Sequence, residues 1–143
     1  MAAPTATVRR IVLGRDLSRC VSCGTHTSPL EMQHRQAVGA GGAKRRPEPH
    51  ELATACSRCN MRFESDLQTE ALARGWKVRR WVKEPGLVPM FNAAANRWGL
   101  LTSTGGVVLI TEQDAAARMR EVYGGEWIRW AVDVGLIKQE RSA

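Results

Sequence analysis

Two pairs of cysteines carry the strongest chemical signal in the sequence. Two residues separate the members of each pair, which are Cys20 with Cys23 and Cys56 with Cys59. A tight turn at each pair would present two thiolates to one ion, and two such turns complete a tetrahedral sulfur shell that favours Zn²⁺. Because that shell leaves no open position, the expected role of the zinc is structural. Four unrelated buried cysteines remain an alternative, and no βαβ pattern supports a thioredoxin-like redox pair.

A second set of residues that could do chemistry lies between and just after these pairs. His34 is bracketed by the cysteines, Asn60 follows Cys59 at once, and Glu64 stands four residues after Asn60. Each has a plain alternative when it is considered alone. His34 could be a polar strand residue that hydrogen-bonds a loop, Asn60 could only cap a helix, and Glu64 could only complement a helix dipole.

Basic residues are concentrated in the same part of the chain. The 143 residues have a net charge of +7, but residues 1–83 hold 15 Lys/Arg against 7 Asp/Glu, whereas residues 84–143 hold 6 against 7. A solvated surface would account for the excess, but its segregation favours a face that binds a polyanion. The sequence therefore indicates a nucleic-acid partner for the first 83 residues.

Local patterns predict the elements that would position these groups. A short helix over 7–16 leads into the first cysteine pair, a strand lies in 28–36, a Gly-rich basic loop fills 37–49, and a helix runs over 60–75 with Gly75 after its end. Further along, the patterns predict a strand over 76–82, an antiparallel meander of three short strands, and helices over 111–124 and 126–137. The expected domains are 1–83 and 84–143.

The order of these motifs resembles a known family. The arrangement CVSCG, EMQHR, GAGG, ELATACSRCN and FE is similar to the HNH nucleases of the His-Me finger group, and closely so to the small HNH proteins of actinobacterial phages. The likeness runs from about Arg10 to Val82. It implies an α+β protein with a ββα-metal (His-Me finger) unit closed by a four-cysteine zinc site, followed by the β-meander and helices.

The resemblance also implies roles for individual residues in a metal-dependent DNA endonuclease. His34 matches the general base, and Gln33, Asn60 and Glu64 match ligands of a catalytic divalent ion. Two amide oxygens and one carboxylate suit Mg²⁺ or Mn²⁺ better than zinc. Double-stranded DNA would be the partner, and the basic side chains expected to contact its phosphates are Arg35, Lys44, Arg45 and Arg46.

Two positions depart from the family pattern. Gln33 stands where the family commonly has Asp or His, and Glu51 replaces the middle Asn that fixes the loop orienting the base, a task to which neighbouring His50 is a candidate substitute. These departures support an alternative hypothesis, in which the protein has an HNH scaffold with a decayed catalytic site and only binds DNA. The Trp-containing tail, 84–143, keeps open a third hypothesis, a zinc-containing adaptor that docks another protein through this tail.

The remaining expectations concern location. No apolar run reaches the roughly 20 residues that a membrane span needs. The N-terminus MAAPTATVRR lacks the apolar region of a signal peptide. A cytoplasmic protein is therefore expected, in the host cell if the chain is encoded by a phage.

Overall fold

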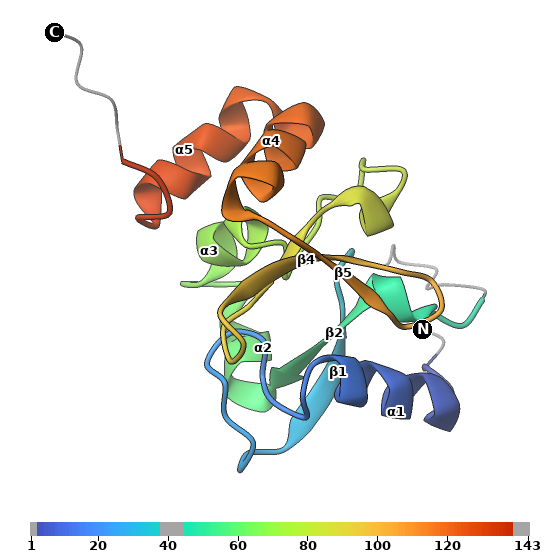
Figure 1. Ribbon diagram of the computed structural model, residues 1–143. Helices are drawn as coiled ribbons and strands as arrows, with labels where there is room; N and C mark the ends of the chain where they lie inside the picture. The colour runs from blue at the N-terminus through green and yellow to red at the C-terminus, as the bar shows by residue number, and fades with distance from the viewer. Residues whose placement is uncertain (1–2, 38–44, 139–143) are drawn as a thin grey trace, which may run out of the picture.

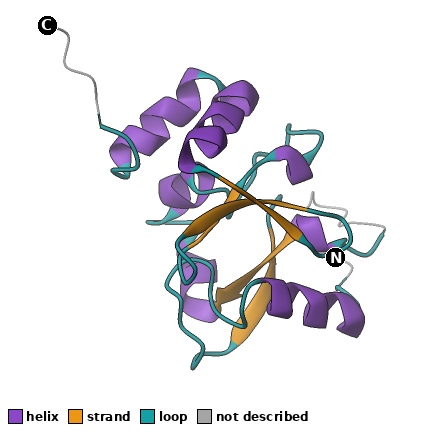
Figure 2. Cartoon of the chain, viewed as in Figure 1, coloured by secondary structure: helices purple, strands orange, loops and turns teal. Residues whose placement is uncertain are grey.

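A computed structural model describes residues 3–37 and 45–138. They form an α+β arrangement with one two-stranded and one three-stranded antiparallel sheet, as the sequence predicts (Figures 1 and 2). Helix α1 (Ala6–Arg15) lies beside the two-stranded sheet, whereas α4 (Glu112–Tyr123) and α5 (Gly125–Asp133) pack together at the other end of the molecule. No helix in the described ranges is long and apolar enough to cross a membrane.

The two-stranded sheet pairs β1 (Leu30–His34) with β2 (Leu52–Cys56). The strands are antiparallel, and Leu30 lies opposite Cys56 while His34 lies opposite Leu52. Every residue of β2 is buried. Helix α2 (Ser57–Arg62) follows β2 with no loop between them. This direct succession places Asn60 beside the strand that ends in His34.

Helix α1 is fixed to β2 by a buried ion pair at its C-terminal end. Arg15 and Asp16 contact each other at 2.8 Å with both side chains almost fully buried. The guanidinium also donates to the carbonyl oxygens of Pro49 and Leu52, and the Asp16 carboxylate accepts from the N–H of Thr54. Because every charged group here has hydrogen-bond partners, the pair can remain buried and hold α1 against the sheet.

The helix predicted over 60–75 is interrupted, and this prediction was wrong in its middle. Helix α2 ends at Arg62, and α3 (Gln68–Ala73) starts after a turn. Arg62 binds Asp66 and Ser65 contacts the same carboxylate. Phe63 turns inward, and its ring stacks on that of Trp76 with the ring centroids 5.4 Å apart. Gly75 does follow the end of α3, with φ +77°.

The strand predicted over 76–82 was also wrong. Its only ladder contact among the described residues is a single parallel bridge between Gln36 and Val78. The side-chain amide of Gln36 donates to the carbonyl oxygens of Arg79 and Val82, at 3.0 and 2.7 Å. A side chain therefore satisfies the carbonyls that a neighbouring strand would have bound, and the segment turns instead of extending.

The predicted meander is present as β3 (Met90–Asn92), β4 (Arg97–Leu101) and β5 (Val107–Ile110), in the order β3-β4-β5. Thr111 caps α4 by accepting a hydrogen bond from the N–H of Asp114. Short 3₁₀ turns, η1 (Pro49–Glu51) and η2 (Pro85–Leu87), precede β2 and β3. The second predicted helix is α5, which ends at Asp133.

The hydrophobic core joins the two predicted domains. One buried cluster combines the cysteine region and Trp76 with Met90 and Leu101 of the meander. A second combines Val78 and Val82 with the side chains of β4, α4 and α5. The indole N–H of Trp127 in α5 donates to the carbonyl of Ala73 in α3. Both clusters thus cross the predicted boundary at residues 83 and 84.

Candidate metal centre and active-site pocket

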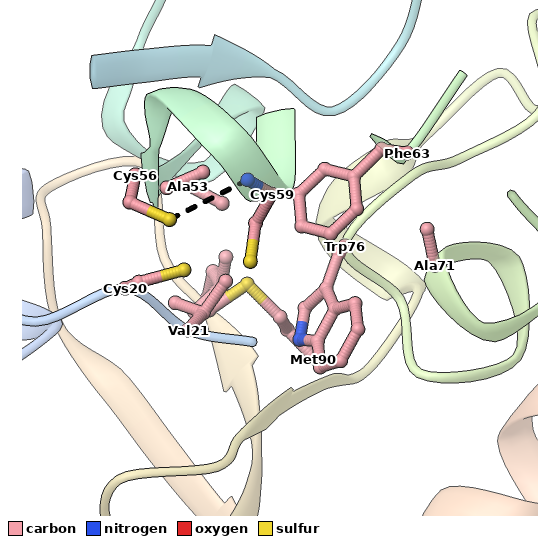
Figure 3. Close-up of a cluster of buried hydrophobic side chains, with 11 residues drawn as sticks. Cys20, Val21, Ala53, Cys56, Cys59, Phe63, Ala71, Trp76 and Met90 are labelled. Carbon is pink, nitrogen blue, oxygen red and sulfur yellow. Dashed lines mark hydrogen bonds between the residues drawn. The ribbon is translucent and has the colours of Figure 1, made fainter. Parts of the chain in front are cut away.

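The four cysteines converge on one point beneath the two-stranded sheet. Their sulfur atoms lie within 4.8 Å of one another, and these residues are Cys20, Cys23, Cys56 and Cys59. Figure 3 shows three of these sulfurs directed towards each other, with Phe63 and Trp76 packed alongside. Cys23 is exposed and the other three are buried. This geometry is compatible with one bound metal ion, and four sulfur ligands fit a structural zinc.

Hydrogen bonds and burial both act on the thiol groups of this cluster. The Sγ of Cys56, at the start of α2, accepts from the N–H of Cys59 and lies 3.8 Å from the Sγ of Cys23. Burial raises the pKa of Cys20 and of Cys59. Burial acts in the same direction on Cys56, but hydrogen bonds from Cys59 bring the pKa of Cys56 below its ordinary value. Four thiolates at this place therefore require a cation to offset their charge.

A separate pocket of about 500 Å³ brings together the residues predicted for catalysis. We call it the active-site pocket, after the role that the sequence analysis predicts for these residues. The predicted residues in its lining are Gln33, His34, Asn60 and Glu64. His34 ends β1 and Asn60 lies in α2, whereas Glu64 lies in the turn after α2 and not on the same helix as predicted. The turn nevertheless keeps Glu64 at the pocket.

Gln33 forms the buried wall of this pocket. Its side-chain N–H₂ donates to the carbonyl oxygen of Trp76 at 2.5 Å, and only 4% of the residue is exposed. The amide oxygen, Oε1, is buried without a hydrogen-bond partner among the described residues. Buried acceptors are nearly always satisfied, whereas this oxygen is an acceptor left without a partner among the described residues at the buried wall of the pocket.

Asn60 is oriented by a residue that the sequence analysis did not single out. The Asn60 amide donates to the carboxylate of Glu31 at 2.7 Å, and Ser57 donates to the same carboxylate. These two hydrogen bonds hold the pKa of Glu31 below its usual range. With its nitrogen bound to Glu31, Asn60 keeps its carbonyl oxygen available as a ligand. Glu31 lies two residues before Gln33 in β1, so strand alternation was the available signal.

Glu64 and His34 share a lysine partner. The ammonium group of Lys77 lies 2.8 Å from the Glu64 carboxylate and donates to the main-chain oxygen of His34 at 3.3 Å. Lys77 also lines the active-site pocket. It comes from the segment predicted as a strand, far along the chain from His34, so no local pattern could identify it.

The imidazole of His34 is kept neutral by its surroundings. Partial burial lowers the pKa of His34, the carboxylate of Glu51 acts in the opposite direction, and the charge of Lys77 lowers it further. The net shift is downward from 6.5. A neutral imidazole can accept a proton at neutral pH, as a general base must.

The prediction that Arg35 contacts DNA phosphates was wrong. Its side chain is fully buried and donates to the carbonyl oxygens of Gly75, His50, Pro85 and Val88. Burial lowers the pKa of Arg35 to about 9, which still leaves the guanidinium charged at neutral pH. Arg35 alternates with His34 along the chain, so the side chain that follows the base points into the core.

Of the other basic residues predicted to contact phosphates, Arg45 and Arg46 are exposed. Arg45 binds the Glu51 carboxylate at 2.7 and 3.1 Å, with its own side chain 67% exposed. Arg46 is exposed and donates to the carbonyl of Ala3. Lys44 lies outside the described residues. The contact with Arg45 occupies the Glu51 carboxylate, at the position that the resemblance matches to the middle Asn of the HNH nucleases.

His50 does not take over that position. It lines a different pocket, of about 450 Å³, together with Lys83 and Gly86. Its Nδ1 lies 3.5 Å from the carboxylate of Glu48. Because His50 is absent from the lining of the active-site pocket, its suggested role in orienting His34 has no support in the geometry.

Comparison with known proteins gives no relative. Family models, curated proteins and solved structures yield no match to the chain.

Proposed function

We propose that the protein is a metal-dependent HNH-type endonuclease that hydrolyses phosphodiester bonds in DNA. The observation that carries this proposal is the shared pocket of about 500 Å³, lined by His34, Gln33, Asn60 and Glu64. These residues come from a strand, the helix that follows the paired strand, and the turn after that helix. The basic excess of residues 1–83 supports a polyanionic substrate.

His34 is the general base in this proposal. Its lowered pKa keeps the imidazole in the neutral form, so its free ring nitrogen can take a proton from the attacking water. The hydrogen bond from Lys77 to the main-chain oxygen of His34 fixes the end of β1. The base is thereby held on a rigid element instead of a loop.

Gln33, Asn60 and Glu64 would hold a divalent ion, Mg²⁺ or Mn²⁺. The unpartnered Oε1 of Gln33 and the Asn60 amide turned by Glu31 fit oxygen ligands for such an ion. When bound, the ion supplies positive charge that offsets charge developing on the phosphate oxygens. Glu64 would have to exchange its contact with Lys77 for the ion.

The cysteine cluster has a structural part in the proposal. Zn²⁺ held by the four thiolates would tie the loop after α1 to the junction of β2 and α2. That junction carries Asn60 one residue beyond Cys59. The zinc site would therefore set the position of the helix from which Asn60 faces the pocket.

A second candidate is a DNA-binding protein whose catalytic metal site has decayed. The ion pair between Glu64 and Lys77 favours it, because among the described residues it neutralises the only carboxylate lining the active-site pocket. The neutral amide of Gln33 is also a weaker ligand than a carboxylate. Such a protein would bind DNA in a salt-sensitive way and leave it intact.

Plasmid cleavage separates the two candidates. Supercoiled DNA is incubated with the full chain and Mg²⁺ or Mn²⁺, and the rates of nicked and linear product are compared with those of His34→Ala. Loss of a general base is expected to slow cleavage by about 10²- to 10⁴-fold. His26→Ala is the matched control, since His26 is exposed and does not line the pocket. If the plasmid and a gapped duplex both stay intact while the protein binds them in a salt-sensitive way, the second candidate is supported.

A further inference from the structure

One segment beside the active-site pocket combines positive charge with an exposed aromatic ring. Residues 77–83 contain four basic side chains and no acidic one, and Trp81 lies among them. The basic residues are Lys77, Arg79, Arg80 and Lys83. We call residues 77–83 the basic turn, since the chain turns there instead of forming a strand.

The basic turn is attached directly to the end of β1. The N–H of Val78 donates to the carbonyl of Arg35 at 2.7 Å, and Gln36 binds the carbonyls of Arg79 and Val82. Gln36 lines both the active-site pocket and the neighbouring pocket that contains Lys83. The basic turn therefore extends from one pocket towards the other along a fixed path.

Trp81 differs from most other tryptophans of the chain. It is 59% exposed, whereas Trp76, Trp98 and Trp127 are all nearly buried. Its ring is nevertheless in contact with Tyr123, with centroids 5.5 Å apart and planes at 86°. A large apolar ring that is held in place yet mostly open to solvent is a surface on which another flat group can stack.

Two of the four basic side chains of the basic turn are available to a ligand. Arg79 is engaged with Glu126 and lies over the ring of Trp130, and Lys77 is engaged with Glu64. Arg80 and Lys83, in contrast, are exposed and make no ion pair within the described residues. Two free cations thus flank the exposed ring.

We propose that the basic turn binds a nucleotide with an unpaired base, which stacks on Trp81 while Arg80 and Lys83 contact the adjacent phosphates. The assignment to a polynucleotide follows from charge complementarity together with the exposed ring. This inference rests on the proposed function, and it specifies the substrate further: unpaired bases lie next to the bond that is cleaved. A duplex offers an unstacked base only at an end, a gap or a junction.

The stacking part is tested with short oligonucleotides and the zinc-loaded chain, without Mg²⁺ or Mn²⁺. Trp81→Ala is expected to weaken the binding of single-stranded oligonucleotide by about 5- to 100-fold and to change duplex binding less than about 2-fold. Trp81→Phe retains most of the affinity, because phenyl rings also stack. Leu109→Ala is the matched control, since Leu109 is 57% exposed on β5. Unchanged thermal unfolding verifies that the variants fold.

The phosphate contacts are tested through salt dependence. Arg80→Ala and Lys83→Ala should each reduce the slope of log affinity against log salt by about 0.7 for single strands. Arg118→Ala, an exposed arginine on α4, should leave the slope unchanged. Equal effects of the three substitutions would overturn the proposed phosphate contacts.

The result can be separated from that of the cleavage experiment. If Trp81→Ala binds single strands as wild type does, or weakens duplex binding to the same extent, the stacking site is wrong even where the plasmid is cut. If single-strand binding depends on Trp81 while neither the plasmid nor a gapped duplex is cut with Mg²⁺ or Mn²⁺, the stacking site stands and the nuclease proposal fails.

Discussion

The cysteine cluster and the active-site pocket lie at two sides of the same junction between β2 and α2, yet they are organised differently. In the cluster, four sulfurs point at one another and have few other partners. In the pocket, Asn60 is bound to Glu31 and Glu64 is bound to Lys77. Four thiolates in the first arrangement are costly without a cation, whereas in the second Asn60 and Glu64 already have protein partners. The difference suggests that one metal would contribute to folding and the other would bind to a folded chain.

The largest effect is expected from breaking the cluster. Cys59→Ser, or removal of zinc by a chelator, should lower the free energy of unfolding by on the order of 5 kcal/mol or more, because binding energy at such a site is folding energy. Thermal unfolding followed by circular dichroism, with zinc content measured on the same samples, checks this. Met61→Ser on the same helix is the control, as Met61 is 76% exposed. Normal unfolding in zinc-free protein would remove the distinction between the two sites.

A comparable, slightly smaller effect is expected just behind the pocket. Arg35→Met leaves four buried carbonyl oxygens without their donor and should destabilise the fold by about 3–5 kcal/mol. Arg45→Met, at an exposed ion pair, should change stability by less than about 1 kcal/mol. Urea denaturation of the two variants measures the difference between their free energies of unfolding. Similar losses would mean that Arg35 is not the structural residue that its contacts indicate.

The pocket itself should respond in metal affinity and hardly in stability. Glu64→Gln is expected to weaken Mn²⁺ binding to the zinc-loaded chain by about 10- to 100-fold, since a carboxylate is replaced by a neutral amide. Titration calorimetry gives the affinity. Asp66→Asn serves as the matched control, because this nearby carboxylate binds Arg62 and does not line the pocket. Equal losses in both variants would point to non-specific attraction of the cation.

The smallest effect has the opposite sign. Lys77→Met removes the ammonium group that competes for Glu64 and should tighten Mn²⁺ binding by about 3- to 10-fold. Lys83→Met, in the same basic turn but outside the pocket, is the comparison that separates local competition from general charge. Weaker binding in Lys77→Met would show that Lys77 supports the site instead of competing with the metal.

Much of the fold followed from local sequence. Apolar spacing predicted α1, a capping signal before an Ala-rich stretch predicted α4, and turn residues between short apolar runs predicted the three-stranded meander. The prediction of one helix over 60–75 failed where the chain turns at residues 63–67, and the packing of Phe63 on Trp76 accompanies this break. The strand over 76–82 failed because Gln36, from a distant part of the chain, takes up its carbonyls.

The candidate site was predictable where a residue's role depends on its neighbours in sequence. The two closely spaced cysteine pairs, and Asn60 directly after Cys59, could be identified in this way. Glu31, Lys77 and the true environment of Arg35 could not, since each depends on pairing between segments distant in sequence. Trp81 was predictable in part. The sequence shows the basic residues around it, but only the fold shows that its ring is exposed.

The sequence by itself determined which chemical groups are available and in what order: two thiolate pairs, three histidines between them, an amide and a carboxylate four residues apart, and a basic first half. Only the tertiary structure decided which of these groups are available to a ligand. An arginine carries the same charge at any position, but burial among four carbonyls commits Arg35 to the core, while exposure leaves Arg80 free to bind. The physical reason is that desolvation and long-range hydrogen bonds, which set the role of a polar group, depend on packing between segments that the sequence does not place side by side.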